Sequence, residues 1–159
     1  MKIDIRSMSH ADKHHVTKIL RGTPEFKPFE VVVAEELIDC YLEDPLSSGY
    51  HILVAEVDSN ITGYICYGSA PLTEGTWDIY WVAVARERQG RGIGNALMKS
   101  AEKDAVRDKG RLAIIETSST PAYEKTRHFH LSQGYEIVAR IPDFYAPGDD
   151  KLILQKRLR

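Results

Sequence analysis

Apolar residues recur along this chain with two different periods, and these periods predict an alternating series of strands and helices. Alternating or continuous apolar runs predict strands over residues 2–6, 51–57, 61–67, 79–84, 112–116, 135–139 and 151–158. Helical spacing predicts helices over residues 10–21, between the proline-broken linker 23–29 and Asp44, from Gly92 to about Lys109, and from Pro121 to Gln133. Residues 141–150 contain Pro, Gly and Asp and predict a long turn. No repeat or linker divides the series, which favours a single domain over residues 1–159.

The strongest signal is a strand–turn–helix unit in the middle of the chain. Residues 79–84 form a continuous apolar run, which is typical of a strand buried on both faces. After a charged turn, residues 89–94 (Gln-Gly-Arg-Gly-Ile-Gly) lead into a helix with Ile93, Leu97 and Ala101 on one face. Glycines let backbone amides crowd together, and the first amides of a helix lack partners and lie at the positive end of its dipole. The turn therefore predicts an anion-binding site.

Two phosphate-binding motifs do not fit this turn. A Walker loop ends in Gly-Lys-Ser/Thr, whereas this turn continues as Ile93-Gly94-Asn95. A dinucleotide-binding fold has the spacing G-x-G-x-x-G, whereas Gly90, Gly92 and Gly94 stand at every second position. A turn that merely connects a strand to a helix is the alternative to a site.

Composition narrows the class of protein further. Hydrophobic residues make up 43% of the chain, which suits a domain with a buried core, and the net charge of −2 gives no sign of a nucleic-acid partner. No apolar run approaches the ~20 residues that span a bilayer. The charged N-terminus does not resemble a signal peptide, so we expect a cytoplasmic protein. Cys40 and Cys66 lack metal-ligand spacing and are expected to be buried, reduced thiols; we predict no metal site.

The motifs around the glycine-rich turn resemble those of one known family. Gln-x-x-Gly-x-Gly, from Gln89 to Gly94, follows a V-x-V strand end at residues 82–84, and residues 129–135 match the pattern F-Y-x-x-x-G-F with His130 in place of the tyrosine. Both are similar to motifs of the GNAT superfamily of acyl-CoA N-acyltransferases. The resemblance implies an α/β fold: a twisted, mixed sheet of six to seven strands, helices on both faces, and a splayed central strand pair.

The resemblance also implies a cofactor, acetyl-CoA, and the residues that hold it. In the family, amides of such a turn bind the pyrophosphate of coenzyme A, and the preceding strand end pairs with pantetheine. Pairing of that kind requires a gap between the central strand and the strand at Leu112, because the same groups cannot also serve a complete sheet ladder. The implied cofactor-binding residues in this sequence are Val82, Ala83, Val84, Gln89, Gly90, Arg91, Gly92, Ile93, Gly94, Asn95 and, on the expected cofactor wall, Arg127.

Acyl transfer to an amine requires a base for the amine and a proton for the departing thiolate. Asp78 is the candidate base, because a period of two places Asp78, Tyr80, Val82 and Val84 on one strand face; a solvated Asp is the alternative. Glu116 is the second carboxylate to test. His130 occupies the position of the family's acidic Tyr and, with an ordinary pKa near 6.5, is the candidate acid. Tyr123, two turns earlier, is the other candidate, and the thiolate leaving unassisted is a third possibility.

The acceptor is harder to predict than the cofactor. Candidate acceptor-binding residues are Phe26 and Phe29 in the linker together with Tyr67, Tyr80 and Tyr145. Packing between two helices explains Phe26 and Phe29 equally well, and ordinary sheet packing or a hairpin turn explains the tyrosines better. The resemblance implies an N-acetyltransferase that moves the acetyl group of acetyl-CoA directly to a primary amine of a small molecule or a peptide. A non-catalytic acetyl-CoA-binding regulatory protein is the alternative. Family members often form homodimers, so a homodimer is possible here.

Overall fold

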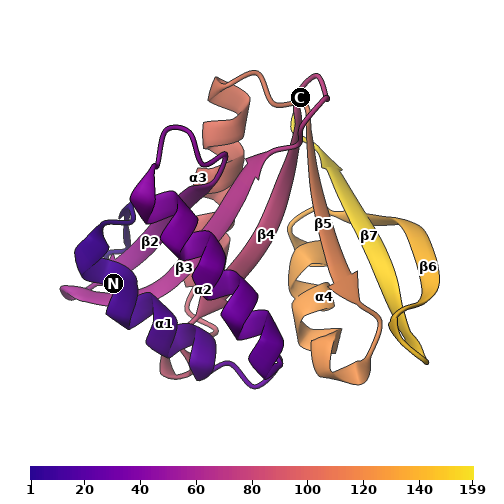
Figure 1. The fold of residues 1–159 in the computed structure, drawn as a ribbon, viewed down its shortest axis with the longest axis horizontal. Helices are drawn as coiled ribbons and strands as arrows, with labels where there is room; N and C mark the ends of the chain where they lie inside the picture. The colour runs from indigo at the N-terminus through magenta and orange to yellow at the C-terminus, as the bar shows by residue number, and fades with distance from the viewer.

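The computed structural model describes residues 1–159 and contains one seven-stranded sheet in the order β1-β2-β3-β4-β5-β7-β6 (Figure 1). All neighbouring strands are antiparallel except β4 and β5, which are parallel. The strands are β1 (Asp4–Ser7), β2 (His51–Val57), β3 (Asn60–Ser69), β4 (Thr76–Val84), β5 (Leu112–Ser118), β6 (Glu136–Ala146) and β7 (Asp149–Arg157). The helices are α1 (Lys13–Arg21), α2 (Pro28–Glu43), α3 (Ile93–Arg107) and α4 (Glu124–Ser132), with short 3₁₀ turns η1 (His10–Asp12), η2 (Arg86–Arg88) and η3 (Pro121–Tyr123).

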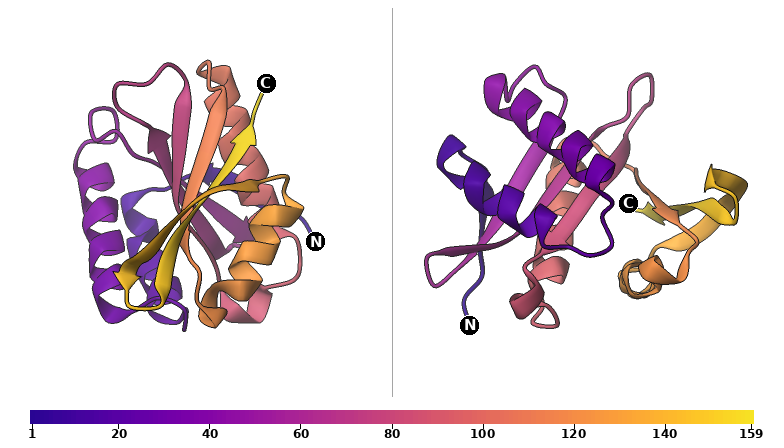
Figure 2. Two further views of the ribbon diagram at one scale, coloured as in Figure 1. Left: turned by 90° about the vertical axis from the view of Figure 1, so that its right-hand side faces the viewer. Right: turned by 60° about the horizontal axis from the view of Figure 1, so that its bottom comes forward.

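The helices cover both faces of the sheet, as expected (Figure 2). α1 and α2 bury residues such as Val16, Leu20 and Ile38 against one face. α3 buries Leu97 and Met98 against the other. Helix boundaries follow local chemistry, since Pro28 occupies the first position of α2, where its missing N–H costs nothing. None of these helices has the length and apolar character needed to cross a membrane.

The sheet splits where β4 and β5 separate. Their parallel ladder pairs Thr76–Ile79 with Leu112–Ile115 and then stops. Beyond that point β5 continues beside β7, while residues 80–84 of β4 have no strand partner on the side that faces β5. Figure 1 shows the two strands diverging toward α4. The predicted splayed strand pair is confirmed, and it leaves one edge of β4 with free backbone groups.

A β-bulge in β4 corrects the predicted strand faces. Cys66 is opposite Trp81 and Tyr67 is opposite Ile79, so Tyr80 is an extra residue. One extra residue reverses the alternation of side chains. Val82 and Val84 therefore pack on the α3 side together with Ile79, whereas Trp81 and Ala83 pack on the side of α1 and α2. Asp78 does not share a face with Val82 and Val84, and β4 is not buried on both faces, since Tyr80 is exposed.

The C-terminal hairpin and one cysteine also differ from the prediction. Residues 141–146 continue strand β6 instead of forming a long turn, with Ile141 opposite Lys151 and Ala146 opposite Asp149. β6 is an edge strand whose side chains are mostly exposed. It is therefore defined by backbone pairing with β7, and its sequence lacks the apolar alternation that would have predicted a strand. Cys66 is buried as expected, but Cys40 is exposed.

Candidate active site

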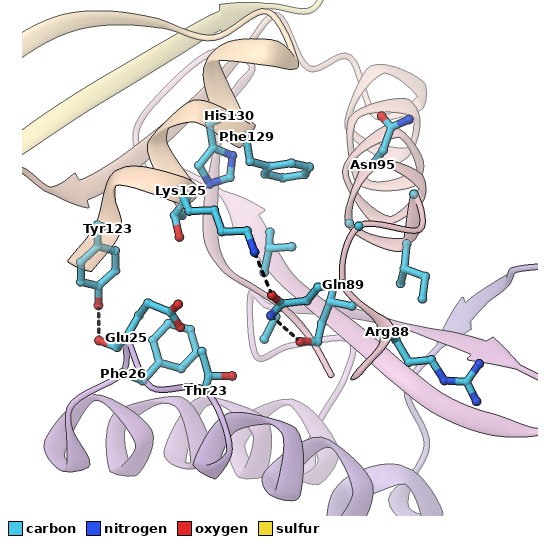
Figure 3. Close-up of a pocket in the computed structure, with 18 residues that line it drawn as sticks. Thr23, Glu25, Phe26, Arg88, Gln89, Asn95, Tyr123, Lys125, Phe129 and His130 are labelled. Atoms are coloured by element: carbon cyan, nitrogen blue, oxygen red, sulfur yellow. Dashed lines mark hydrogen bonds between the residues drawn. The ribbon is translucent and has the colours of Figure 1, made fainter. Parts of the chain in front are cut away.

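A cavity of about 280 Å³ lies where β4 and β5 separate (Figure 3). Residues from the end of β4, the glycine-rich turn, the start of α3, α4 and the segment between α1 and α2 form its walls. The lining residues are Thr23, Glu25, Phe26, Val82, Ala83, Val84, Arg88, Gln89, Gly90, Gly92, Ile93, Gly94, Asn95, Tyr123, Lys125, Thr126, Phe129 and His130. The cavity thus gathers most of the predicted cofactor residues and both candidate acids.

The glycine-rich turn has the geometry of an anion cradle. Gly90 and Gly92 adopt φ values of +76° and +84°, a region that favours glycine, and Gly92 caps the N-terminus of α3. No acidic residue stands in the first turn of α3, so the partial positive charge of its free amides is not neutralised there. A Cβ on Gly94 would lie 3.2 Å from the Phe129 ring, which shows how closely α4 approaches the cradle.

Two basic side chains that sequence reasoning missed stand beside this cradle. Arg88 and Lys125 both line the cavity. The Lys125 ammonium lies 3.5 Å from Oε1 of Gln89, whose Nε2 donates to the carbonyl of Val84 at 3.2 Å. Gln89 therefore ties the turn to the end of β4, and Lys125 brings a positive charge from α4 to the opposite wall. Nothing in the sequence distinguishes Lys125 from other surface lysines, because only the fold brings α4 to the turn.

Two predicted cofactor residues are not part of the cavity lining. Arg127 donates from Nη1 to the carbonyls of Ser118 (2.9 Å) and Thr120 (2.7 Å), so it fixes the connection between β5 and α4. Arg91 is exposed and does not line the cavity, although its backbone belongs to the turn. Arg127 is thus better explained as a structural residue, and the basic residues that do line the cavity are Arg88 and Lys125.

His130 lies in the cavity wall and is only 5% exposed. Its Nδ1 atom is buried without a hydrogen-bond partner. Burial lowers the pKa of His130 to about 4, so the imidazole is neutral at pH 7. The expectation of an ordinary pKa near 6.5 is therefore wrong, because it ignored the cost of burying the charged ring.

Tyr123 lies on η3, immediately before α4, and spans the cavity. Its hydroxyl lies 3.0 Å from Oε2 of Glu30 and 3.0 Å from the carbonyl oxygen of Glu25, to which Figure 3 shows it pointing. Burial, followed by the charge of Glu30, raises the pKa of Tyr123 above its ordinary value. The phenol thus keeps its proton at neutral pH and shares it between two acceptors of the α1–α2 side.

Asp78 lies outside the cavity lining, on the opposite face of β4 from Ile79. Its carboxylate takes part in no hydrogen bond or ion pair of the structure, and it is only partly exposed. Burial raises the pKa of Asp78, and the charge of Glu116 raises it further. Glu116 itself pairs with Lys151 at 2.9 Å.

The predicted acceptor residues separate into three groups. Phe26 lines the cavity, whereas Phe29 is 63% exposed and lies outside it. Tyr67 is buried on the α3 side, where its hydroxyl donates to Asp104 at 2.6 Å, so it is a core residue and the prediction was wrong. Tyr80 and Tyr145 remain partly exposed beyond the cavity. Tyr80 packs edge-on against Tyr50, with ring centroids 5.6 Å apart.

Comparison with known proteins defines the class. The model of the acetyltransferase (GNAT) family matches residues 16–135. A crystal structure from Desulfovibrio desulfuricans, assigned to the GNAT family, superimposes with a TM-score of 0.95, is 38% identical, and covers 99% of this chain and 100% of its own. A structure from Salmonella typhimurium that contains acetyl-CoA superimposes with a TM-score of 0.74 and 22% identity over 99% of this chain and 94% of its own.

A curated relative agrees with this class. An uncharacterised N-acetyltransferase of Methanocaldococcus jannaschii is 31% identical over 107 residues, which cover 65% of this chain and 64% of that protein's length. The match thus spans less than two thirds of the relative. Because the family model spans most of the chain and the Desulfovibrio desulfuricans structure superimposes over nearly the whole chain, the chain belongs to the acetyltransferase (GNAT) family, a family of acyltransferase enzymes.

Proposed function

We propose that this protein transfers the acetyl group of acetyl-CoA to a primary amine, by direct attack of the amine while both molecules are bound. One observation carries the proposal: the free edge of β4, the glycine-rich turn and the start of α3 line a single cavity. Family membership and the acetyl-CoA in the Salmonella typhimurium structure support the choice of cofactor.

The residues of the cavity fit such a cofactor. The diphosphate of coenzyme A would be held by the amides of residues 90–95, with Arg88 and Lys125 adding positive charge from two sides. The arm of the cofactor contains amides, and the unpaired edge of β4 at residues 82–84 offers backbone groups to them. The buried, unpartnered Nδ1 of His130 is a polar atom whose cost of burial a bound molecule would offset.

Bound acetyl-CoA supplies an activated acyl thioester, and the protein must supply a neutral amine. An alkylamine has a pKa near 10, so removing its proton at pH 7 costs about 4 kcal/mol. We propose that Asp78 accepts this proton from the amine, directly or through a water molecule. Its raised pKa makes the carboxylate a stronger base, and no cation competes for it.

The departing thiolate needs a proton, and the two candidate donors differ. A neutral His130 has no readily lost proton at pH 7, so we assign it to hydrogen bonding within the cavity. Tyr123 keeps its proton and lines the same cavity, but its hydroxyl must break its hydrogen bond to Glu30 before it can donate to the thiolate. Because a thiol has a pKa near 8.5, its thiolate is a competent leaving group even when proton transfer comes late.

Calorimetry with acetyl-CoA, followed by thiol release with a broad amine panel read by mass spectrometry, tests the proposal. We expect binding and the formation of an acetylated amine. Binding without turnover on any amine would instead favour the non-catalytic acetyl-CoA-binding protein, the reading that the neutral His130 keeps open. Three further points stay predictions: the nature of the acceptor as a small molecule or a peptide, the formation of a homodimer, and the cytoplasmic location.

A further inference from the structure

The segment between α1 and α2, residues 23–27, forms one wall of the cavity; we call it the α1–α2 connector. Thr23, Glu25 and Phe26 line the cavity, and the ring of Phe26 also packs against the core under α1 and α2. Within the connector, the amide of Phe26 donates to the carbonyl of Thr23 at 3.1 Å, and the Thr23 hydroxyl donates to the carbonyl of Ile19 at 2.8 Å. These bonds shape the turn, but they do not join it to the opposite wall of the cavity.

Tyr123 makes that connection. Its hydroxyl lies 3.0 Å from the carbonyl oxygen of Glu25 and 3.0 Å from Oε2 of Glu30, which stands in the first turn of α2. Figure 3 shows the phenol reaching from η3 toward the α1–α2 connector. No other hydrogen bond joins residues 23–27 to a residue beyond α2. One hydroxyl therefore provides the whole hydrogen-bonded link between the connector and the side of the split sheet that carries η3 and α4.

The surroundings of the Tyr123 hydroxyl suit it to holding the connector. A phenol has one proton, and both acceptors within reach lie at the connector or at the start of α2. The bond to Glu30 is charge-assisted, which makes it stronger than a bond between neutral groups. Glu30 has no other polar side-chain contact in the structure, so nothing competes with the phenol for its carboxylate.

We propose that Tyr123 is a positioning residue for acetyl transfer, whose hydroxyl holds the α1–α2 connector in the place that acceptor binding requires. This inference rests on the proposed function and gives Tyr123 a part in it other than that of proton donor. In the proposed function the cofactor occupies the glycine-rich turn and the free edge of β4. The acceptor then meets the remaining walls, among them the connector with Phe26. Loss of the hydroxyl should weaken acceptor binding and leave cofactor binding unchanged.

The first test observes the connector directly and needs no acceptor. Tyr123→Phe removes the hydroxyl and keeps the ring in the cavity wall. Hydrogen exchange read by mass spectrometry should become about tenfold faster in peptides that cover residues 23–31, which is the order of effect for losing one hydrogen bond to a charged group. Tyr41→Phe is the matched control, because Tyr41 lies toward the other end of α2, donates to the carbonyl of Met8 at 3.1 Å and does not line the cavity. Exchange at residues 23–31 should not change in this control.

The second test separates positioning from proton donation. With the amine that the wild type acetylates fastest, Tyr123→Phe should raise KM for the amine about tenfold and change kcat by less than about twofold. The shape of the pH–rate profile and the calorimetric affinity for acetyl-CoA should stay as in the wild type. A general acid at this position would instead lower kcat and alter the basic limb of the profile.

A conservative change at Glu30 completes the design. Glu30→Gln keeps an oxygen that can accept from the phenol, so KM should stay within about twofold of the wild type. Added to Tyr123→Phe, it should raise KM no further, because Glu30 acts on the connector only through the hydroxyl. An effect of Glu30→Gln that adds fully to that of Tyr123→Phe would contradict this link.

The two tests fail in different ways. Unchanged exchange at residues 23–31 in Tyr123→Phe, or a fall in kcat with KM unchanged, would overturn the inference and leave the proposed function intact. Binding of acetyl-CoA with no acetylation of any amine would remove the proposed function and the part of Tyr123 in it. The exchange experiment would still decide whether Tyr123 holds the connector.

Discussion

The glycine-rich turn follows the end of β4, whereas Asp78, near the start of β4, lies with other carboxylates on the sheet face turned toward α2. The turn presents backbone amides, and two basic residues, Arg88 of η2 and Lys125 of α4, line the same cavity. The sheet face turned toward α2 presents carboxylates from four elements: Asp78 of β4, Glu116 of β5, Asp149 of β7 and Glu30 of α2. The amides of the turn come from one local segment and can be recognised in its sequence, whereas Lys125 and the carboxylates of β4, β5, β7 and α2 come together only once the chain has folded. Three of the predictions below perturb one or the other region, and the ion pair of Asp12 with Arg6, which belongs to neither, serves as a reference.

The largest effect is expected at Gly92. A β-branched residue at φ +84° is strained, so Gly92→Val should displace the first amides of α3 and lower the affinity for coenzyme A by about a hundredfold or more. Isothermal titration calorimetry measures this. Gly49→Val is the matched control, because Gly49 has φ +81°, open space around its Cα, and no place in the cavity. A similar loss of affinity in both variants would show that strain alone is responsible.

The next largest effect is expected at Asp78, one of the carboxylates on the sheet face turned toward α2. Asp78→Asn should reduce kcat about a hundredfold while leaving cofactor affinity unchanged, because a general base acts on the amine and not on the cofactor. In the wild type, the rate should fall as pH decreases through the raised pKa of Asp78, since a protonated carboxyl cannot accept the proton. A variant that retains this acidic limb would exclude Asp78 as its source.

A smaller effect, on stability and not on turnover, is expected at Asp12, whose carboxylate is paired with Arg6. Asp12 accepts hydrogen bonds from both terminal nitrogens of Arg6, at 2.7 and 2.9 Å, and this guanidinium lowers the pKa of Asp12 to about 2. Because the folded pKa is depressed, its contribution to stability is present above pH 4 and lost as pH falls toward 2. Asp12→Asn should cost about 1 kcal/mol, discounted for the partly exposed Arg6, and leave turnover unchanged. Urea denaturation at pH 7 and at pH 3 should show a difference between the proteins that shrinks at the lower pH.

The smallest effect is expected at Glu116. Its charge raises the pKa of Asp78, so Glu116→Gln should move the acidic limb of the pH–rate profile to lower pH, with little change in the maximum rate. Lys151 loses its partner in this variant, and the Lys151→Met, Glu116→Gln double variant controls for the freed cation. A limb that stays in place would mean that the two carboxylates do not interact.

The same comparison explains what could be predicted from the sequence. The turn from Gln89 to Asn95 follows from a local motif, the break between β4 and β5 was implied by the family resemblance that this motif carries, and the structure contains both. The bulge at Tyr80 could not be predicted, because it depends on the register with β3. Because of that bulge, the prediction that Asp78 and Val82 share a strand face was wrong. Pattern alone could not distinguish Tyr67 in the core from Tyr145 at the surface, since the two are alike in type and in strand location.

The roles of residues that depend on tertiary contacts could not be predicted from the sequence either. Arg127 has the charge of a phosphate ligand, but its guanidinium fixes two carbonyls of the preceding loop. Lys125, two positions away, faces the cavity instead. Only the placement of α4 against the turn distinguishes the two residues.

A crystal structure with coenzyme A bound tests the central claim most directly. The account predicts the diphosphate on the amides of residues 90–95, with Arg88 and Lys125 beside it, and the arm of the cofactor along the free edge of β4. A diphosphate located anywhere else, or an arm that does not contact residues 82–84, would contradict the account.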